Sequence, residues 1–281
     1  FAPALAAGNT VVAKPSEVTP MTAYLFSKIC QKADFPKGVI NIVHGYGHKV
    51  GDALSRHPDV PIISFTGGTA TGEKIAAVAA PMFKKLSLEM GGKNPNIIFE
   101  DADFDNAVKM SAKAAFSNQG QICLCGSRLF VQESIYDKFR TAVIQETQTL
   151  KVGDPKDEKS NLGAVVSKPH MQKILNCIDA AKAEGGEILT GGNRVILEGD
   201  LKDGYYIEPT IIDGLTANCK TNQEEIFGPV VSMIPFKTEE EVIEMANSTR
   251  YGLSASLFTK DVSRAHRVAA AIDSGIVWVN T

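Results

Sequence analysis

Residues 61–80 of the chain read PIISFTGGTATGEKIAAVAA, and this segment sets the expected fold class. Its first six residues, 61–66, are mostly apolar and include β-branched side chains, which is typical of a buried strand. A glycine-rich turn follows, and the small and apolar residues of 71–80 recur at helical spacing. A strand that passes through a tight turn into a helix is the repeating unit of α/β proteins.

The same strand, turn and helix recur on both sides of this segment. Toward the N-terminus, expected strands at 10–14 and 39–43 are followed by expected helices at 21–32 and 49–55. Beyond residue 90 the alternation resumes, with expected strands at 96–99, 129–132, 230–235, 254–258 and 275–279 and helices at 104–117, 136–149, 169–183, 239–247 and 263–272. We therefore expect an α/β fold with two open, mainly parallel, helix-covered sheets.

The boundary between the two sections is expected at Gly91 and Gly92, where the strand-like segment KLSLEM ends. Two adjacent glycines allow the chain to cross from one domain to the next. The expected domains are residues 1–91 and residues 92–281. Because the sequence opens on Phe1 within an apolar stretch and ends on the strand-like IVWVNT, we also expect it to be the central piece of a longer polypeptide.

Composition excludes several classes of protein. The chain has 281 residues, 44% hydrophobic and 22% charged, with a net charge of −3 and dispersed basic residues, so no nucleic-acid or membrane partner is expected. No apolar run is long enough to span a membrane. The five cysteines do not make a disulfide framework, so we expect a reducing, cytoplasmic location. Their spacing does not fit a zinc site and the five histidines lie in separate segments, so we expect no metal.

Two segments near expected strand ends carry candidate nucleotide-binding groups. Lys14 and Glu17 follow a strand, where ligands bind in open α/β sheets, and could hold ribose hydroxyls. Glu17 would also repel a ribose 2′-phosphate, which favours NAD over NADP. The glycine-rich turn containing Gly67 and Gly72 could approach a phosphate, although it lacks the GxGxxG pattern. For Lys14 and Glu17 the alternative is a solvated helix start. For the glycine-rich turn it is an ordinary βα turn.

Two further segments carry candidate catalytic groups. Glu89 lies beside the glycine pair, and a cleft there would raise its pKa toward that of a general base; a surface carboxylate is the alternative. Cys123 lies on a polar, glycine-bounded loop, where a nucleophilic thiol would be accessible. Cys125, Cys30 and Cys177 are better explained as inert buried thiols, and Cys219 is left unassigned.

A fifth segment is EEIFGP at residues 224–229. Its Glu225 carboxylate could bind a ribose and its Phe227 ring could pack on a flat cofactor ring. The alternative is an ordinary loop before a strand.

Each of the five segments is weakly informative alone. Together and in this order, AGNTVVAKPSE, SFTGGTATG, LEMGGKNP, NQGQICLCGSR and EEIFGPV resemble the successive signature segments of the aldehyde dehydrogenase family, along essentially the whole chain. The spacing between Glu89 and Cys123 agrees with that family's pattern.

This resemblance implies a Rossmann-like NAD-binding part, a catalytic domain, and a specific set of site residues. Cys123 matches the nucleophile and Glu89 the general base. The positions matching cofactor contacts are Lys14, Glu17, Gly67, Gly72, Glu225, Phe227 and, by a looser alignment, Lys173. Gly68 replaces a frequent Ser and Met90 a frequent Leu. The family's N-terminal part, with the asparagine that completes its oxyanion hole, and the segment after the last strand have no counterpart in this sequence.

The reaction that the resemblance implies is NAD-dependent oxidation of a small-molecule aldehyde to its acid, through a thiohemiacetal and a thioester on Cys123. The residues around the nucleophile favour a semialdehyde such as 2-aminomuconate semialdehyde, and a homodimer or homotetramer is expected for the complete protein. One alternative is a CoA-acylating semialdehyde dehydrogenase, although Glu89 argues against it. The other is a catalytically incomplete nucleotide-binding fragment.

Overall fold

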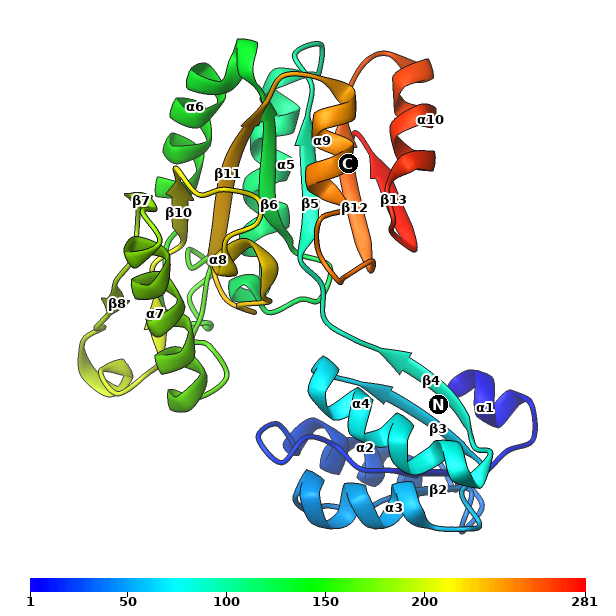
Figure 1. Cartoon of the computed structure of the whole chain (residues 1–281). Coiled ribbons are helices and arrows are strands. Elements are labelled where there is room, and N and C mark those ends of the chain that lie inside the picture. The colour runs from blue at the N-terminus through cyan, green and yellow to red at the C-terminus, as the bar shows by residue number, and fades with distance from the viewer. The chain divides into compact units, whose positions relative to one another are not determined.

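The computed structural model describes all residues from Phe1 to Thr281 and divides them into two compact units, Phe1–Met90 and Gly91–Thr281. Figure 1 shows both units as ribbons, and each is described here by itself. The division falls beside the glycine pair Gly91 and Gly92. No helix in either unit is long and apolar enough to cross a bilayer.

The N-terminal unit contains two pairs of parallel strands with helices between them in sequence. Strand β1 (Val11–Ala13) pairs with β2 (Ile40–Ile42), and β3 (Ile62–Thr66) pairs with β4 (Lys85–Glu89). The helices are α1 (Ala2–Ala6), α2 (Met21–Lys32), α3 (Asp52–Arg56) and α4 (Thr69–Ala79). The helix expected at 49–55 starts differently, because a π-helical turn at Gly47–Gly51 precedes α3. Short α1 was not expected from the sequence.

The C-terminal unit is built on one seven-stranded sheet. Its strand order is β13-β12-β5-β6-β11-β10-β7, and all neighbours are parallel except β10 and β7. The strands are β5 (Asn94–Ile98), β6 (Gly126–Gln132), β7 (Glu187–Thr190), β10 (Thr210–Asp213), β11 (Val230–Phe236), β12 (Ser254–Phe258) and β13 (Ile276–Val279). A small antiparallel pair, β8 (Arg194–Val195) and β9 (Tyr206–Ile207), lies outside this sheet.

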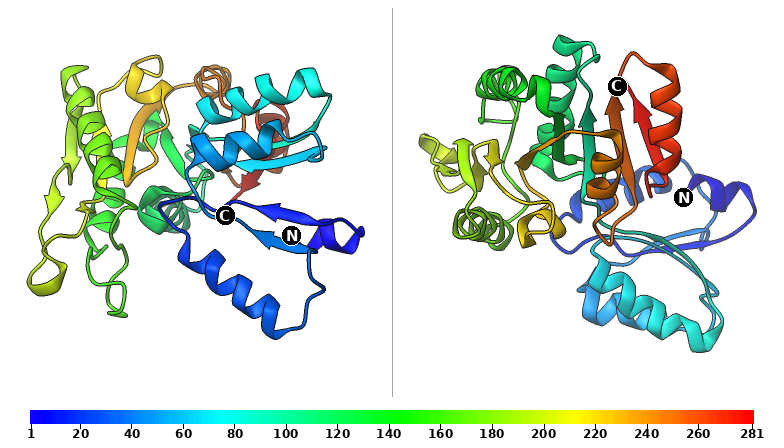
Figure 2. Two further views of the ribbon diagram at one scale, coloured as in Figure 1. Left: turned by 90° about the horizontal axis from the view of Figure 1, so that it is seen from below. Right: turned by 45° about the horizontal axis from the view of Figure 1, so that its top comes forward.

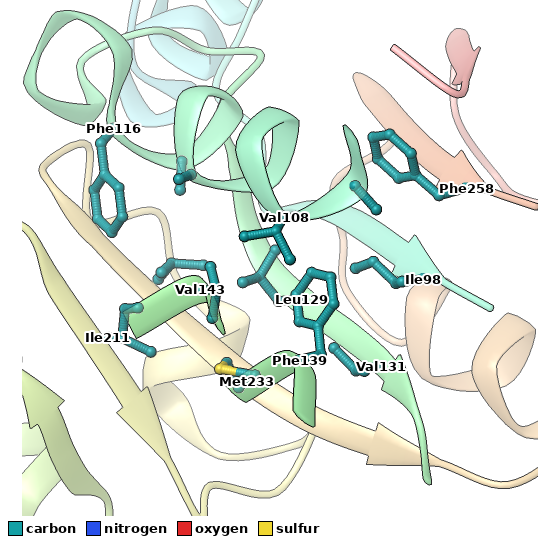
Figure 3. Packing of buried hydrophobic residues seen from close by; sticks show 14 of the residues in the cluster. Ile98, Val108, Phe116, Leu129, Val131, Phe139, Val143, Ile211, Met233 and Phe258 are labelled. Atoms are coloured by element: carbon teal, nitrogen blue, oxygen red, sulfur yellow. The ribbon is translucent and has the colours of Figure 1, made fainter. Parts of the chain in front are cut away.

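Helices cover both faces of the sheet, because successive strand residues point to opposite sides. Leu129 and Val131 of β6 pack with α5 (Phe104–Phe116) and α6 (Tyr136–Gln148), as Figure 3 shows. Phe130, between them, packs on the other face with α9 (Glu239–Ala246) and α10 (Val262–Ala271). Figure 2 shows the sheet between these two helical layers. The alternation of the sequence therefore produces the layered α/β fold that it predicts.

Side chains that cap helices fix where several of these helices begin. Asp103, Ser167, Thr238 and Asp261 each precede a helix and accept a hydrogen bond from a backbone N–H of its first turn. Such caps satisfy donors that have no partner within the helix. The Ser167 cap fixes the start of α7 (Lys168–Ala183). This helix carries His170 and Lys173 to the segment of Glu225 and Phe227.

Candidate active site

The loop that carries Cys123 lies between a short 3-10 turn, Ser117–Gly120, and strand β6. Asn118, Gln119 and Gly120 are all in the left-handed region, with φ of 50°, 57° and 67°. A Cβ on Gly120 would lie 2.0 Å from the carbonyl oxygen of Gly228, so only glycine fits there. This unusual backbone presents Cys123 half-buried, as the sequence analysis expects of an accessible thiol.

The remaining thiols lie in environments that suppress reactivity. Cys125 is buried, and burial raises the pKa of its thiol to about 11. Burial also raises the pKa of Cys177 in α7 and of Cys219, which begins the short helix α8 (Lys220–Gln223). Cys30 is buried in α2. Because the thiolate is the nucleophilic form, these shifts disfavour Cys125, Cys177 and Cys219 as nucleophiles.

This difference predicts the selectivity of thiol labelling. At pH 8 roughly one Cys125 thiol in a thousand is ionised, since the pH lies about three units below its pKa. We expect iodoacetamide to modify Cys123 and spare Cys125 in the folded protein, with labelling of Cys125 rising as the pH approaches 11. Tandem mass spectrometry of the peptide containing both cysteines measures this. The guanidinium-unfolded protein is the control, and equal labelling of both thiols in the folded state would contradict the assignment.

The segment that carries Glu225 and Phe227 is held against the same loop. The Glu225 carboxylate accepts a hydrogen bond from the backbone N–H of Gly92 at 3.1 Å. A Cβ on Gly91 would lie 2.1 Å from that carboxylate, so the first glycine of the pair makes room for it. Phe227 has φ 60°, a left-handed conformation rare for an aromatic residue. Such strain at a candidate site is consistent with a fixed functional geometry.

Two side chains of helix α7 bond to the backbone of the Glu225 and Phe227 segment. Lys173 donates from Nζ to the Glu225 carbonyl oxygen at 3.2 Å. The ribose contact that the resemblance implies for Lys173 stays a prediction. His170 Nε2 lies 2.7 Å from the Phe227 carbonyl oxygen, and its ring packs on Phe227. Burial lowers the pKa of His170, which favours the neutral ring. In the sequence His170 is only one of five histidines in separate segments, so its place beside Phe227 was not predicted.

A cavity of about 20 Å³ lies in this part of the unit, lined by residues that include Cys125, Ser127 and Phe227. That volume admits one water molecule. This cavity is therefore too small for an aldehyde. No group of three or more His, Cys, Asp or Glu side chains is placed to hold a metal ion.

Two buried cations, Arg128 and Lys93, lie in β6 and just before β5. Arg128 of β6 is fully buried and donates to the carbonyl oxygens of Lys93, Met245 and Ala246. Lys93 is 2% exposed, and burial, with the nearby Arg128 charge as the second cause, lowers its pKa to about 8. Neither residue was predicted from the sequence, although Arg128 is a cation within the mostly apolar strand β6; Lys93 lies just before β5.

In the N-terminal unit, Lys14 and Glu17 lie beside a pocket. The Lys14 ammonium is 3.4 Å from the Glu17 carboxylate and donates to the Gly45 carbonyl oxygen at 3.2 Å. Hydrogen bonds from backbone N–H groups, its own first, lower the pKa of Glu17 and favour the carboxylate. The pocket has a volume of about 380 Å³ and is lined by Pro15, Ser16, Glu17, Pro20, Met21, Tyr24, His44, Gly45 and Tyr46.

The glycine-rich turn and Glu89 also meet within this unit. The Gly67 N–H donates to the Glu89 carbonyl oxygen at 3.0 Å, and Gly68 is the N-cap residue of α4. A Cβ on Gly72 would lie 2.2 Å from the Met90 sulfur, so glycine permits this close packing. Glu89 itself is exposed at the end of β4. The cleft expected around its carboxylate stays a prediction.

The predicted residues thus fall into two groups. Cys123, Lys173, Glu225 and Phe227 come together in the C-terminal unit, while the N-terminal unit holds Lys14, Glu17, Gly67, Gly72 and Glu89. The pairing of Cys123 with Glu89 stays a prediction.

Comparison with known proteins identifies the family. The aldehyde dehydrogenase family model matches residues 1–281, and the chain belongs to this family. It is 51% identical over 282 aligned positions to the 2-aminomuconic semialdehyde dehydrogenase of Mus musculus, covering 100% of this chain and 58% of that protein. It is 46% identical to the 4-trimethylaminobutyraldehyde dehydrogenase A of Danio rerio, with 99% and 55% covered.

A solved structure of an aldehyde dehydrogenase has the same fold as this chain. The betaine aldehyde dehydrogenase of Staphylococcus aureus, determined in complex with NAD+, superposes with a TM-score of 0.96 at 46% identity, covering 99% of this chain and 55% of that one. The chain therefore spans somewhat more than half the length of the relatives that it matches, and its two units have the aldehyde dehydrogenase fold.

Proposed function

We propose that this chain supplies the nucleophile, the general base and most of the cofactor-binding residues of an NAD-dependent aldehyde dehydrogenase. The observation that carries the proposal is the half-buried Cys123 on its left-handed loop in a member of this family. Its carbonyl oxygen lies against Gly92, whose N–H donates to the Glu225 carboxylate. The N-terminal unit is proposed to bind the nucleotide and the C-terminal unit to carry the catalytic thiol. The complete protein is proposed to be a homodimer or homotetramer.

The residues present fit a dinucleotide. The pocket beside Glu17 has room for an adenosine-sized group, and the Glu17 carboxylate favours ribose hydroxyls over a 2′-phosphate. Gly67 and Gly68 bring backbone to the start of α4, where N–H groups favour phosphate. Glu225 and Phe227 are proposed to hold the nicotinamide ribose and to pack beside the nicotinamide. Lys173 then positions Glu225 through its carbonyl oxygen.

The proposed reaction begins with attack by the Cys123 thiolate on the aldehyde carbon, giving a thiohemiacetal. The backbone N–H of Cys123 is proposed to donate to the oxyanion. NAD, when bound, accepts the hydride that leaves this carbon. Glu89 then removes a proton from water, and the hydroxide attacks the thioester on Cys123 to release the acid and the thiol. The exposed position of Glu89 on its own unit gives water access to the carboxylate.

The proposed substrate is a semialdehyde, such as 2-aminomuconate semialdehyde. Support comes from the identity to relatives of that name and from the residues around Cys123. Other relatives, at 46% identity, are named for trimethylaminobutyraldehyde and for aminoaldehydes. The shared chemistry is an aldehyde with a second polar or charged group at a distance.

An aldehyde panel tests the proposal with the full-length protein. We expect NADH formation, followed by its absorbance, with NAD strongly preferred to NADP and with kcat/KM highest for a carboxylate-bearing unsaturated semialdehyde. Betaine aldehyde and simple aliphatic aldehydes serve as comparison substrates. A requirement for CoA, or binding of NAD without turnover of any aldehyde, would refute the proposed reaction.

A further inference from the structure

The side chain of Asn94 makes three hydrogen bonds to backbone groups, two of them to the Cys123 loop. Its Nδ2 donates to the carbonyl oxygen of Cys123 at 2.7 Å and to that of Cys125 at 2.9 Å. Its Oδ1 accepts from the backbone N–H of Ser254 in β12 at 3.2 Å. Asn94 is only 3% exposed. A primary amide has two N–H donors, and here each is directed at a different carbonyl oxygen of one loop.

These bonds fix the backbone on both sides of Leu124. Within the loop, the Cys125 N–H donates to the Ile122 carbonyl oxygen at 3.0 Å and closes a turn. Asn94, at the start of β5, binds the carbonyl oxygens of Cys123 and Cys125 through its side-chain amide. A β-bulge between Asn94 and Pro95 interrupts the pairing with β6, and bulges redirect the side chains next to them. The direction of the Cys123 side chain follows from the backbone that carries it.

The hydrogen bonds of Asn94 to the Cys123 loop require a glycine at position 92. A Cβ on Gly92 would lie 2.5 Å from Oδ1 of Asn94 and 2.8 Å from the Cys123 carbonyl oxygen. Any larger residue would therefore push into the amide and the loop together. The same Gly92 donates its N–H to the Glu225 carboxylate. The Asn94 contacts are consequently continuous with the segment that we propose holds the nicotinamide ribose.

A second asparagine on the same strand shows that burial alone does not explain Asn94. Asn96 is fully buried, and its Nδ2 donates to the Ser111 hydroxyl of α5 at 3.0 Å. Its Oδ1 has no partner, so its side chain is only partly satisfied. Asn94, by contrast, is bonded through both ends of its amide. A serine could not replace it, because one hydroxyl donates only one hydrogen bond and two carbonyl oxygens must be held.

We propose that Asn94 is a positioning residue for the nucleophile: its amide fixes the backbone of Cys123 so that the sulfur and the Cys123 N–H face the aldehyde in the reactive geometry. The role deepens the proposed dehydrogenase function and depends on it. Catalytic groups act efficiently only when they are held close to the productive geometry by supporting contacts. Asn94 does not touch the substrate in this account.

The test compares Asn94→Ala with Asn96→Ala in the full-length protein. Both variants lose hydrogen bonding by a buried asparagine of β5, so both are expected to melt at lower temperature. Single-turnover NADH formation is measured with enzyme and NAD in saturating excess over aldehyde. We expect the rate constant to fall roughly tenfold to a hundredfold in Asn94→Ala, with KM for the aldehyde nearly unchanged, and to stay within about threefold in Asn96→Ala.

The single-turnover rate constant separates positioning from folding. A merely structural role would leave fewer active molecules, which lowers the amplitude at limiting enzyme but leaves the saturated rate constant unchanged. Asn94→Asp, which keeps the size and turns an oxygen toward the two carbonyl groups, is expected to be no faster than Asn94→Ala. If Asn94→Ala does not fold, Asn94→Ser, with one donor left, must still lose rate.

The outcomes are decisive. A rate constant for Asn94→Ala within threefold of that for Asn96→Ala overturns the positioning role, as does full rate in Asn94→Asp. Failure of the dehydrogenase function itself would be recognised differently, because the wild-type protein would then form no NADH with any aldehyde, or Cys123→Ala would keep the wild-type rate. The two failures can therefore be distinguished.

Discussion

Substitution of Cys123 by alanine is expected to lower kcat for aldehyde oxidation by about 10⁴-fold or more, because no other group in the proposed site can form the thioester. Cys125 lies two residues away, but its thiol is buried and its pKa is raised to about 11. It cannot take over at neutral pH. NADH formation with saturating aldehyde and NAD measures the loss, and calorimetric titration with NAD checks that the cofactor still binds.

Cys30→Ala is the matched control for this experiment. Cys30 is buried in α2 of the N-terminal unit, so its loss should cost about 1 kcal/mol of stability and leave turnover largely intact. The wild-type protein should lose its activity on alkylation of Cys123, whereas Cys123→Ala has no such site. Turnover by Cys123→Ala within tenfold of the wild type would exclude this residue as the nucleophile.

Much of the fold could be predicted because the helices and strands are long enough to show their periodicity. The helix Met21–Lys32 and the strand Ser254–Phe258 have the bounds that the sequence predicts. The short antiparallel strands β7, β8 and β9 were missed, since two to four residues carry no readable period. The π-helical turn Gly47–Gly51 was missed because its glycines offer no helical signal.

The candidate site divides in the same way. Cys123, Glu225 and Phe227 could be proposed because their segments, taken together and in order, resemble the family's signature segments. Asn94 and His170 could not, because their partners lie far away in the sequence and are backbone carbonyl groups, which leave no signature. Gly120 is a similar case. Its lack of a side chain is required by the carbonyl oxygen of Gly228, more than a hundred residues away.

Substitution of Glu89 by glutamine is expected to separate the two halves of the reaction. Glutamine has the size of glutamate but cannot accept a proton from water, so the thioester on Cys123 should form and then persist. We expect a rapid burst approaching one NADH per active site, followed by a steady-state rate lower by about 10²- to 10⁴-fold. Stopped-flow absorbance measures the burst, and NAD affinity should change little.

Hydroxylamine provides the sharpest check of that interpretation. It attacks a thioester directly and releases a hydroxamate and the free thiol, so it needs no general base and should restore turnover in Glu89→Gln. Glu244→Gln, an exposed carboxylate on α9, serves as the control and should behave as the wild type. A Glu89→Gln variant with no burst and no response to hydroxylamine would place the defect before the thioester and remove Glu89 from the role of base in its hydrolysis. A burst that hydroxylamine converts to continuous turnover requires instead that Glu89, exposed at the end of β4, acts on the water that attacks the carbonyl carbon of the thioester and displaces the Cys123 sulfur.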